Sequence, residues 1–199
     1  VRHIHRKRIV HADLKPDNLF CVFERSHIAA VRIGDFGLAG ENQQGRQFHY
    51  GVLRRIRIAG GTPGYVAPEI LRAGRDRDDQ VCPSEKVDIF ACAVILLELL
   101  LTPFRTAMER AATLERLHSE ALEKVPEIIL SRLPKATALI REMSETDPAV
   151  RLSAEEVCKR FEKEVRKELC RSSTKLCCEP DQPVLSGLTG CKAQPQAQP

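Results

Sequence analysis

Residues 87–101 form an almost uninterrupted apolar stretch, which limits the architectures open to this chain. Asp88 and Glu98 are the only charged residues in it. A helix needs roughly 20 apolar residues to cross a bilayer, so the stretch is too short for a membrane span. It predicts a helix buried in the core of a soluble domain, and no membrane segment is expected.

The elements predicted around this helix change from β to α along the chain. Residues 19–23 and 31–34 are rich in β-forming residues and flank a polar connection, residues 24–27, which together predict a small hairpin. After a polar insert at residues 75–83, the chain is expected to be helical almost throughout. The expected fold class is therefore mainly α, with a short β-hairpin.

The last predicted helix has a recognisable start. Ser153 and Glu156 have the spacing of a capping box, in which each side chain bonds the backbone N–H of the other residue. Behind it, apolar residues recur every four positions, at Val157, Phe161, Val165 and Leu169. From residue 171 the composition turns to Ser, Pro, Gln and Gly, which bury too little apolar surface to become ordered. We therefore expect one domain, residues 1–170, and a disordered tail, residues 171–199.

Composition indicates which kinds of partner and which cellular compartment to expect. The formal net charge is +4 over 199 residues with both signs interleaved, so no direct nucleic-acid site is expected. Three of the eight cysteines, Cys21, Cys92 and Cys158, lie in apolar stretches, and no signal peptide is recognisable. Reduced thiols and a cytoplasmic location are therefore expected. The cysteines of the tail lack the paired spacing of a zinc site.

The chemistry-bearing residues begin with the sequence HADLKPDN, residues 11–18. Phosphoryl transfer needs a carboxylate that accepts the proton of the attacking hydroxyl, a cation near the transferred phosphate and a neutral oxygen ligand for magnesium. Asp13, Lys15 and Asn18 are residues of these three kinds, in that order. The segment resembles the catalytic loop of protein kinases, and Lys15 followed by Pro16 is the pattern of the serine/threonine class.

Two further motifs follow in the order found in protein kinases. DFG, residues 35–37, comes directly after the second β-rich stretch, and APE, residues 67–69, comes later with Thr62 shortly before it. Each short match is weak alone and could mark ordinary solvated loop residues, but three in the correct order are specific. The resemblance to the protein kinase family covers about residues 1–169 and implies ATP and Mg2+ as cofactors.

The resemblance assigns roles residue by residue. Asp13 is the expected catalytic base, and Lys15, Asn18 and Asp35 are expected to bind the nucleotide. Asn18 and Asp35 would do so as ligands of Mg2+. Thr62 is expected beside Asp13 and Lys15, where it helps to hold the acceptor residue, and is counted with the catalytic residues.

Three other residues are expected to be structural. Glu69 should pair with Arg151, because a carboxylate and a guanidinium are each costly to bury alone. Asp88 should accept hydrogen bonds from the backbone of the catalytic loop, which accounts for a carboxylate in an apolar stretch. His11 is expected to pack as scaffold, without a chemical role.

Residues 98–110 carry a narrower resemblance, to the kinases of the translation initiation factor 2 alpha subunit. In that family the matching segment joins the buried central helix to a helix that docks the folded substrate, and Thr106, Met108 and Glu109 match positions of the docking surface. The alternative is an amphipathic helix in which Met108 and Leu114 only pack. The resemblance implies the alpha subunit as protein substrate and regulation of translation under stress, and it is compatible with dimerisation.

The chain departs from the kinase pattern in its regulatory residues. Ala12 stands where most kinases have an arginine that pairs with a phosphate on the activation loop. Residues 38–61 contain no serine or threonine, and Tyr50 is their only hydroxyl. We therefore expect either an activation segment that serine or threonine phosphorylation does not switch, or a kinase that has lost this regulation. Ala93 replaces the usual glycine of the central helix, at a modest expected cost.

No glycine-rich loop, strand lysine or hinge precedes the catalytic loop in this sequence. The expected fold is therefore the C-terminal lobe of a protein kinase with the N-terminal lobe absent, a fragment that is inactive by itself. The alternative function is a catalytically silent, pseudokinase-like interaction module. Retention of Asp13, Lys15, Asn18 and Asp35 argues against it, because a silent module has no physical reason to keep all four.

The basic stretch LRRIRI, residues 53–58, suggests a further hypothesis. It resembles the segment before the acceptor serine of the family's substrate, with Ile58 at the acceptor position. It would then occupy the substrate groove as a pseudosubstrate. The alternative, a solvated basic loop, is favoured because arginine-rich loops are common and need no partner.

Overall fold

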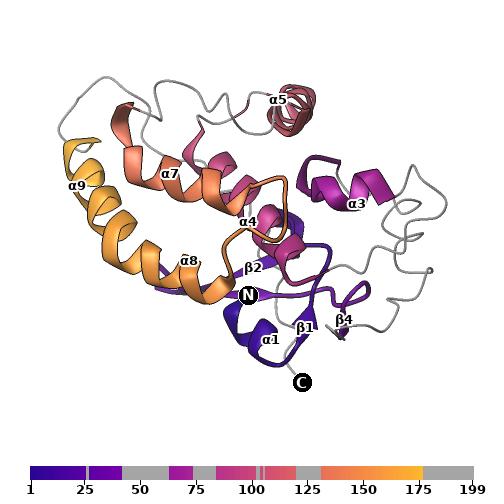
Figure 1. The fold of residues 1–199 in the computed structure, drawn as a ribbon. Helices are drawn as coiled ribbons and strands as arrows, with labels where there is room; N and C mark the ends of the chain where they lie inside the picture. The colour runs from indigo at the N-terminus through magenta and orange to yellow at the C-terminus, as the bar shows by residue number, and fades with distance from the viewer. Residues whose placement is uncertain are drawn as a thin grey trace.

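The computed structural model describes residues 1–25, 27–41, 63–73, 84–101, 104, 106–119 and 131–176. Figure 1 shows a helical body with β structure along one side. Its helices are α1 (Arg2–Arg6), α3 (Pro68–Ala73), α4 (Lys86–Leu100), α5 (Ala107–Ser119), α7 (Pro134–Met143), α8 (Ala154–Arg160) and α9 (Arg166–Leu176). Single turns are η1 (Pro16–Asn18), η2 (Pro63–Tyr65) and the wide turn η3 (Phe161–Val165), and the strands are β1 (Ile9–Val10), β2 (Leu19–Glu24), β3 (His27–Ile33) and β4 (Gly40–Glu41).

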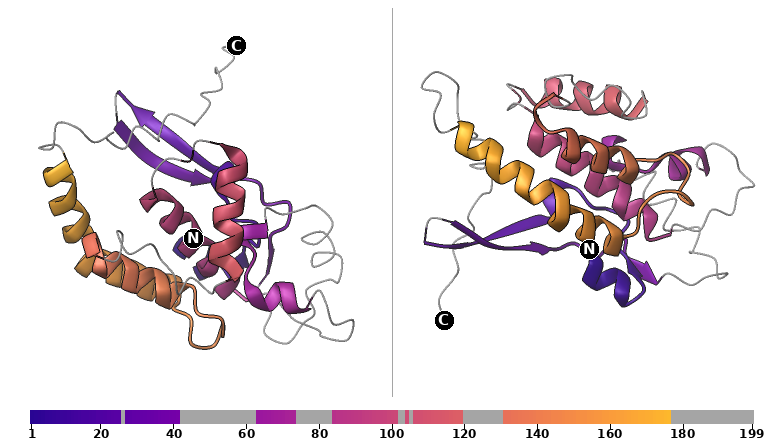
Figure 2. Two further views of the ribbon diagram at one scale, coloured as in Figure 1. Left: turned by 90° about the horizontal axis from the view of Figure 1, so that it is seen from above. Right: turned by 60° about the vertical axis from the view of Figure 1, so that its left-hand side comes forward.

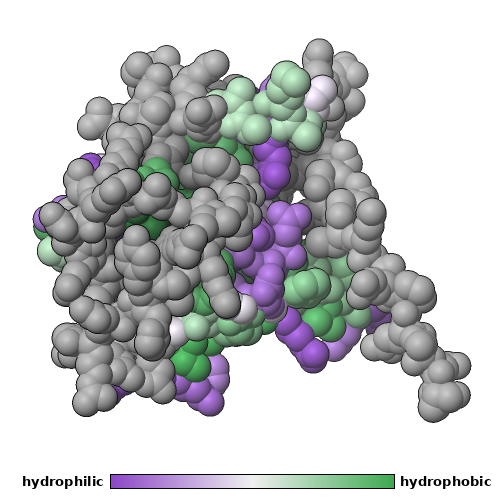
Figure 3. All heavy atoms as spheres, turned by 90° about the vertical axis from the view of Figure 1, so that its right-hand side faces the viewer, coloured by the Kyte–Doolittle hydropathy of each residue, from purple (hydrophilic) through white to green (hydrophobic). Residues whose placement is uncertain are grey.

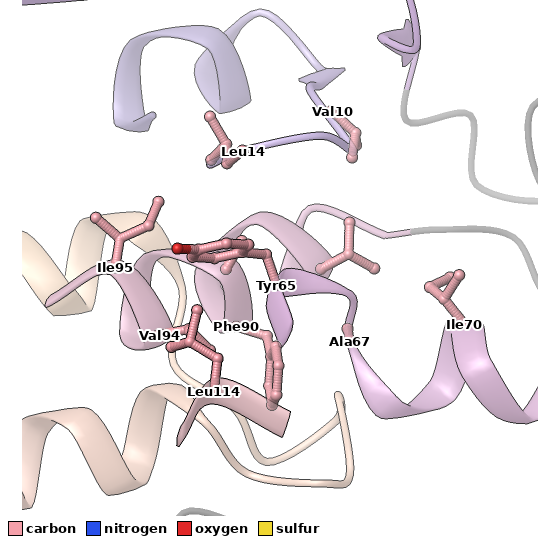
Figure 4. Close-up of a cluster of buried hydrophobic side chains, with 11 residues drawn as sticks. Val10, Leu14, Tyr65, Ala67, Ile70, Phe90, Val94, Ile95 and Leu114 are labelled. Carbon is pink, nitrogen blue, oxygen red and sulfur yellow. The ribbon is translucent and has the colours of Figure 1, made fainter. Parts of the chain in front are cut away.

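The predicted apolar helix is α4, which is buried on opposite sides. Ile89, Ala93 and Leu97 recur every four residues and belong to a hydrophobic cluster shared with α7 and α8. Phe90 and Val94 belong to a second cluster, drawn in Figure 4, together with Val10, Leu14, Tyr65, Ala67, Ile70, Val87, Ala91, Ile95 and Leu114. A helix that packs on both sides has no polar face to present to water, so its sequence is apolar all round.

The β structure corrects the predicted fold class. β2 pairs antiparallel with β3, from Leu19 opposite Ile33 to Glu24 opposite His27. β3 starts four residues before the predicted stretch, because its ends are paired through the backbone of β2 rather than specified by β-forming side chains. Figure 2 shows the hairpin extending as an arm from the helical body.

A second antiparallel pair, β1 with β4, was not predicted from the sequence. The described residues therefore hold two small sheets, each of two strands. A mainly α lobe with a single short hairpin does not describe this arrangement.

The C-terminal helices begin at the predicted capping box, which is confirmed. The Ser153 hydroxyl accepts a hydrogen bond from the Glu156 N–H at 3.3 Å, and the Glu156 carboxylate accepts one from the Ser153 N–H at 2.8 Å. The predicted apolar repeat also packs against the first cluster, through Val157, Phe161, Val165 and Leu169. α9 continues to Leu176, beyond the expected start of the tail at residue 171. Residues 177–199 lie outside the described part of the chain.

In the described part of the chain, no helix has both the length and the apolar character that a membrane span requires. Figure 3 shows one face of the molecule, on which a hydrophilic strip separates apolar patches. The large apolar side chains that the hairpin exposes are Phe20, Phe23, Ile28 and Val31.

Candidate active site

The backbone of His11 and Ala12 is held by a carboxylate from α4. Asp88, which is 1% exposed, accepts hydrogen bonds from the N–H groups of His11 and Ala12, each at 2.8 Å. Its Oδ2 also lies 2.8 Å from Nε2 of His5. Ala12 has φ of 62°, a left-handed conformation that costs a non-glycine residue roughly 1–2 kcal/mol. The two bonds to Asp88 hold the chain in this strained turn directly before Asp13.

Asp13, Lys15 and Asn18 lie together, as their spacing suggested. The Lys15 ammonium donates to Oδ2 of Asp13 at 2.9 Å. The Asn18 amide nitrogen donates to the same oxygen at 3.2 Å and to the Asp13 carbonyl at 2.8 Å. Both donors act on one carboxylate oxygen, which leaves Oδ1 of Asp13 as the atom that can accept a proton from an incoming hydroxyl. These contacts hold the Asp13 carboxylate in one orientation.

Asp35 is joined to the catalytic loop through the backbone. Gly34, directly before it, donates its N–H to the Asn18 carbonyl at 2.9 Å, where the hairpin strands meet. His11 lies 3.0 Å from the Gly34 carbonyl through Nε2 and contacts the Phe36 ring edge to face at 4.8 Å. Asp35 is exposed and has φ of 57°. Aspartate adopts this left-handed conformation more readily than most non-glycine residues, and Arg8 and Arg25 share it.

The donor set suits Mg2+. Because the Asn18 amide nitrogen is used by Asp13, the amide oxygen is the atom available to a cation, and Asp35 adds a carboxylate. Magnesium prefers oxygen ligands and is commonly bound through one or two protein groups, water and substrate phosphates. Within the described ranges no cluster of three or more His, Cys, Asp or Glu side chains could hold a metal, so a dedicated all-protein cage is not present there.

The two residues predicted to pair as scaffold lie in direct contact. Arg151 donates to the two Glu69 carboxylate oxygens at 2.8 and 2.9 Å. Its guanidinium also donates to the carbonyls of Glu145 and Lys86, and it lies 5.3 Å from the centre of the Phe90 ring. Arg151 is 1% exposed, so these partners replace the water that the charge has lost. The pair fixes the APE motif to the C-terminal helices.

The predicted docking residues lie at the start of α5. Thr106 caps this helix, because its hydroxyl accepts the Glu109 N–H at 3.0 Å. Thr106, Met108 and Glu109 are exposed, Met108 to 81%. Leu114 is buried in the second cluster, so the alternative in which both Met108 and Leu114 pack is wrong for Met108.

Several predicted features lie outside the described residues. These are Thr62, Tyr50, the basic stretch at residues 53–58 and most of the loop 38–61. The structure describes only residues 38–41 of that loop, where β4 pairs with β1.

Sequence reasoning missed a polar cluster formed by Tyr65, Glu98 and Arg110. Tyr65 donates its hydroxyl to Glu98, and Arg110 donates to both Glu98 and the Tyr65 oxygen. One signal was available. Glu98 is the second carboxylate of the apolar stretch, and a carboxylate on a buried helix needs partners.

Comparison with known proteins identifies the family. The sequence model of the protein kinase domain matches residues 1–161. Given also the geometry of Asp13, Lys15 and Asn18, the chain belongs to the protein kinase family. Subunit delta of calcium/calmodulin-dependent protein kinase type II from Oryctolagus cuniculus is 37% identical over 161 residues, which are 80% of this chain and 27% of that protein.

Two further relatives come from different kinase groups. The eIF-2-alpha kinase GCN2 of Schizosaccharomyces pombe is 32% identical over 161 residues, 78% of this chain and 10% of that protein. The alpha chain of calcium/calmodulin-dependent protein kinase type II of Drosophila melanogaster is 34% identical over 161 residues, 80% of this chain and 27% of that protein. Overall similarity therefore does not single out the initiation factor kinases.

The family match completes the correction to the fold class. The kinase domain match begins at the first residue and extends to residue 161, and the structure contains antiparallel β structure within it, including the hairpin at residues 19–33. The prediction of a C-terminal lobe with the N-terminal lobe absent is therefore wrong, and no lobe is assigned as missing. The chain spans about a quarter or less of the length of these relatives.

Proposed function

We propose that this chain carries the catalytic residues of an ATP-dependent serine/threonine protein kinase. The observation that carries the proposal is the Asp13 carboxylate, which Lys15 and Asn18 hold through one oxygen while Asp88 holds the preceding turn. A solvated loop aspartate would not need two donors from its own loop and a preceding turn held by a carboxylate of α4.

The residues divide the work of phosphoryl transfer. Asp13 accepts the proton of the substrate's serine or threonine hydroxyl. The oxygen of that hydroxyl bonds to the terminal phosphorus of ATP, and the bond from this phosphorus to ADP breaks. Lys15 lies beside Asp13 and stabilises negative charge on the transferred group. Asn18 and Asp35 would hold Mg2+, which would supply positive charge that neutralises the phosphate oxygens.

The finer proposal is that the substrate is the folded alpha subunit of translation initiation factor 2, docked on α5 in the cytoplasm. It is supported by the resemblance of residues 98–110 and by the exposure of Met108 at the start of that helix. A relative whose name states this activity, the GCN2 kinase, is among the similar proteins. The calcium/calmodulin-dependent relatives are equally similar overall, so the proposal depends on α5 rather than on identity.

The test is phosphate transfer by the full-length protein that contains this chain. With Mg2+ and labelled ATP, we expect incorporation into the folded alpha subunit and, more slowly, into a short serine peptide. Chelation of Mg2+ should abolish both reactions. Absence of transfer to any serine or threonine substrate would support the silent interaction module. Equal rates on both substrates would leave the kinase proposal intact and remove the docking proposal.

A further inference from the structure

The cluster of Tyr65, Glu98 and Arg110 joins three elements that are far apart in the sequence. Tyr65 ends η2, Glu98 lies in the last turn of α4, and Arg110 lies in the first turns of α5. Arg110 also stacks over the Tyr65 ring, with its guanidinium carbon 5.9 Å from the ring centre, and donates to the Tyr65 oxygen at 2.6 Å. The arginine is therefore held by both a carboxylate and an aromatic ring.

The contacts within the cluster keep Arg110 protonated and the Tyr65 hydroxyl neutral. The hydrogen bond to Glu98 raises the pKa of the Arg110 guanidinium, and the carboxylate of Asp17 adds to the effect. Burial and then the hydrogen bond to Glu98 raise the pKa of Tyr65, so its hydroxyl stays a donor.

The position of η2 matters because it lies between two segments of the proposed site. It follows Thr62, which the kinase resemblance places beside Asp13, and it precedes the APE motif, which Arg151 fixes. α5 contacts η2 a second time at Gly64, where an added Cβ would lie 2.8 Å from Cβ of Leu114. The inner face of α5 thus fixes η2, while Met108, two residues before Arg110, is exposed on the same helix.

We infer that Arg110 is a positioning residue, which couples the docking helix α5 to the segment that holds the acceptor residue of the protein substrate. This inference rests on the proposed kinase function and deepens it. Through Glu98 and Tyr65, Arg110 keeps η2 in place relative to the catalytic loop. A substrate bound on α5 then finds η2 correctly placed to hold its acceptor residue. Arg110 touches neither the nucleotide nor the reacting atoms.

The test separates acceptor placement from nucleotide chemistry in the full-length protein. Arg110→Gln should lower kcat/KM for the protein substrate by about tenfold or more, because small misplacements of a reacting group are costly. The KM for ATP and the rate of the slow hydrolysis of ATP by water should stay within about twofold of the wild-type values, since neither depends on the position of η2. Arg110→Lys should restore little, because an ammonium cannot reproduce the forked contacts.

Arg160→Gln is the matched control. Arg160 is also half-buried and pairs with a carboxylate, Glu142, at 2.7 Å, but it lies on α8. The substitution Arg160→Gln should leave kcat/KM for the protein substrate unchanged. Tyr65→Phe should reproduce part of the Arg110→Gln effect, and the double variant should be no slower than Arg110→Gln alone, because both act through one cluster.

The outcomes are distinguishable. If the wild-type protein transfers phosphate and Arg110→Gln does so equally well, Arg110 is a surface ion pair and the inference fails while the kinase proposal stands. A parallel loss of ATP hydrolysis and phosphate transfer in Arg110→Gln would also overturn it, since that pattern means general structural damage. If the wild-type protein hydrolyses and transfers nothing, both proposals fail.

Discussion

At the level of single residues, the proposed kinase reaction gives Asp13 and Asp35 different roles, so the same substitution should affect them differently. Asp13→Asn in the full-length protein removes the proton acceptor, so kcat should fall by about 100-fold or more with ATP affinity nearly unchanged. Asp35→Asn removes a charged Mg2+ ligand, so the affinity for Mg2+-ATP should fall as well. Steady-state kinetics and nucleotide titration distinguish the two, and equal, mild effects would favour the interaction module.

Asp88 provides a second test at this scale. Asp88→Asn places an amide nitrogen against groups that the carboxylate now accepts from, which are the N–H groups of His11 and Ala12 and the ring of His5. An unsatisfied buried group costs about 1–3 kcal/mol or more, so we expect a lower free energy of unfolding together with a lower kcat. Denaturant titration measures the first. Glu162→Gln, in an exposed ion pair with Arg166, is the control and should change neither.

Among the elements, α5 has separate roles in its cap and in its exposed surface. Glu109→Ala and Met108→Ala should impair phosphorylation of the folded alpha subunit and spare a short peptide, because only a remote docking surface is lost. Thr106 needs two variants, since its hydroxyl caps the helix. Thr106→Ser keeps the cap and tests docking by the methyl group, whereas Thr106→Ala also costs about 1 kcal/mol of helix stability. Equal losses on both substrates would show that α5 is purely structural.

The capping box of α8 gives a pH-dependent prediction. The hydrogen bonds from the Ser153 side chain and backbone hold the pKa of Glu156 below its usual value of 4.5. A carboxylate with a lowered pKa stabilises the folded state above its unfolded pKa, and this contribution is lost as the pH falls through the folded pKa. Ser153→Ala should cost about 1 kcal/mol near neutral pH. That cost should shrink below about pH 4, measured by denaturant titration at both pH values; a pH-independent cost would exclude the reciprocal cap.

For the molecule as a whole, the ion pair of Glu69 and Arg151 joins the APE motif to the C-terminal helices across 82 positions of sequence. Arg151→Ala leaves a carboxylate without its partner and should cost about 3–5 kcal/mol of unfolding free energy. Adding Glu69→Gln should recover part of that loss, because the orphaned charge is then removed. A double variant as unstable as the sum of the single variants would mean that the two side chains are not coupled.

Much of the candidate site follows from local sequence. Asp13, Lys15 and Asn18 lie within six residues, so local chain geometry keeps them close, and motif order identified them. The capping box and the four-residue apolar repeat are similarly local, because the period of a helix is a property of the backbone. Residue types and spacing therefore sufficed to predict the catalytic loop, α4 and α8.

The remaining features depend on contacts between distant segments. The full length of β3, the pair β1 and β4, and the cluster of Tyr65, Glu98 and Arg110 arise where residues far apart in the sequence meet. Such pairings leave no period in the local sequence, because the backbone and side-chain partners come from other elements. The sequence alone thus predicts which residues the proposed phosphoryl transfer would use. How α5 is attached to the rest of the molecule is decided by the packing of α4, α5 and η2, where each buried polar group needs a partner.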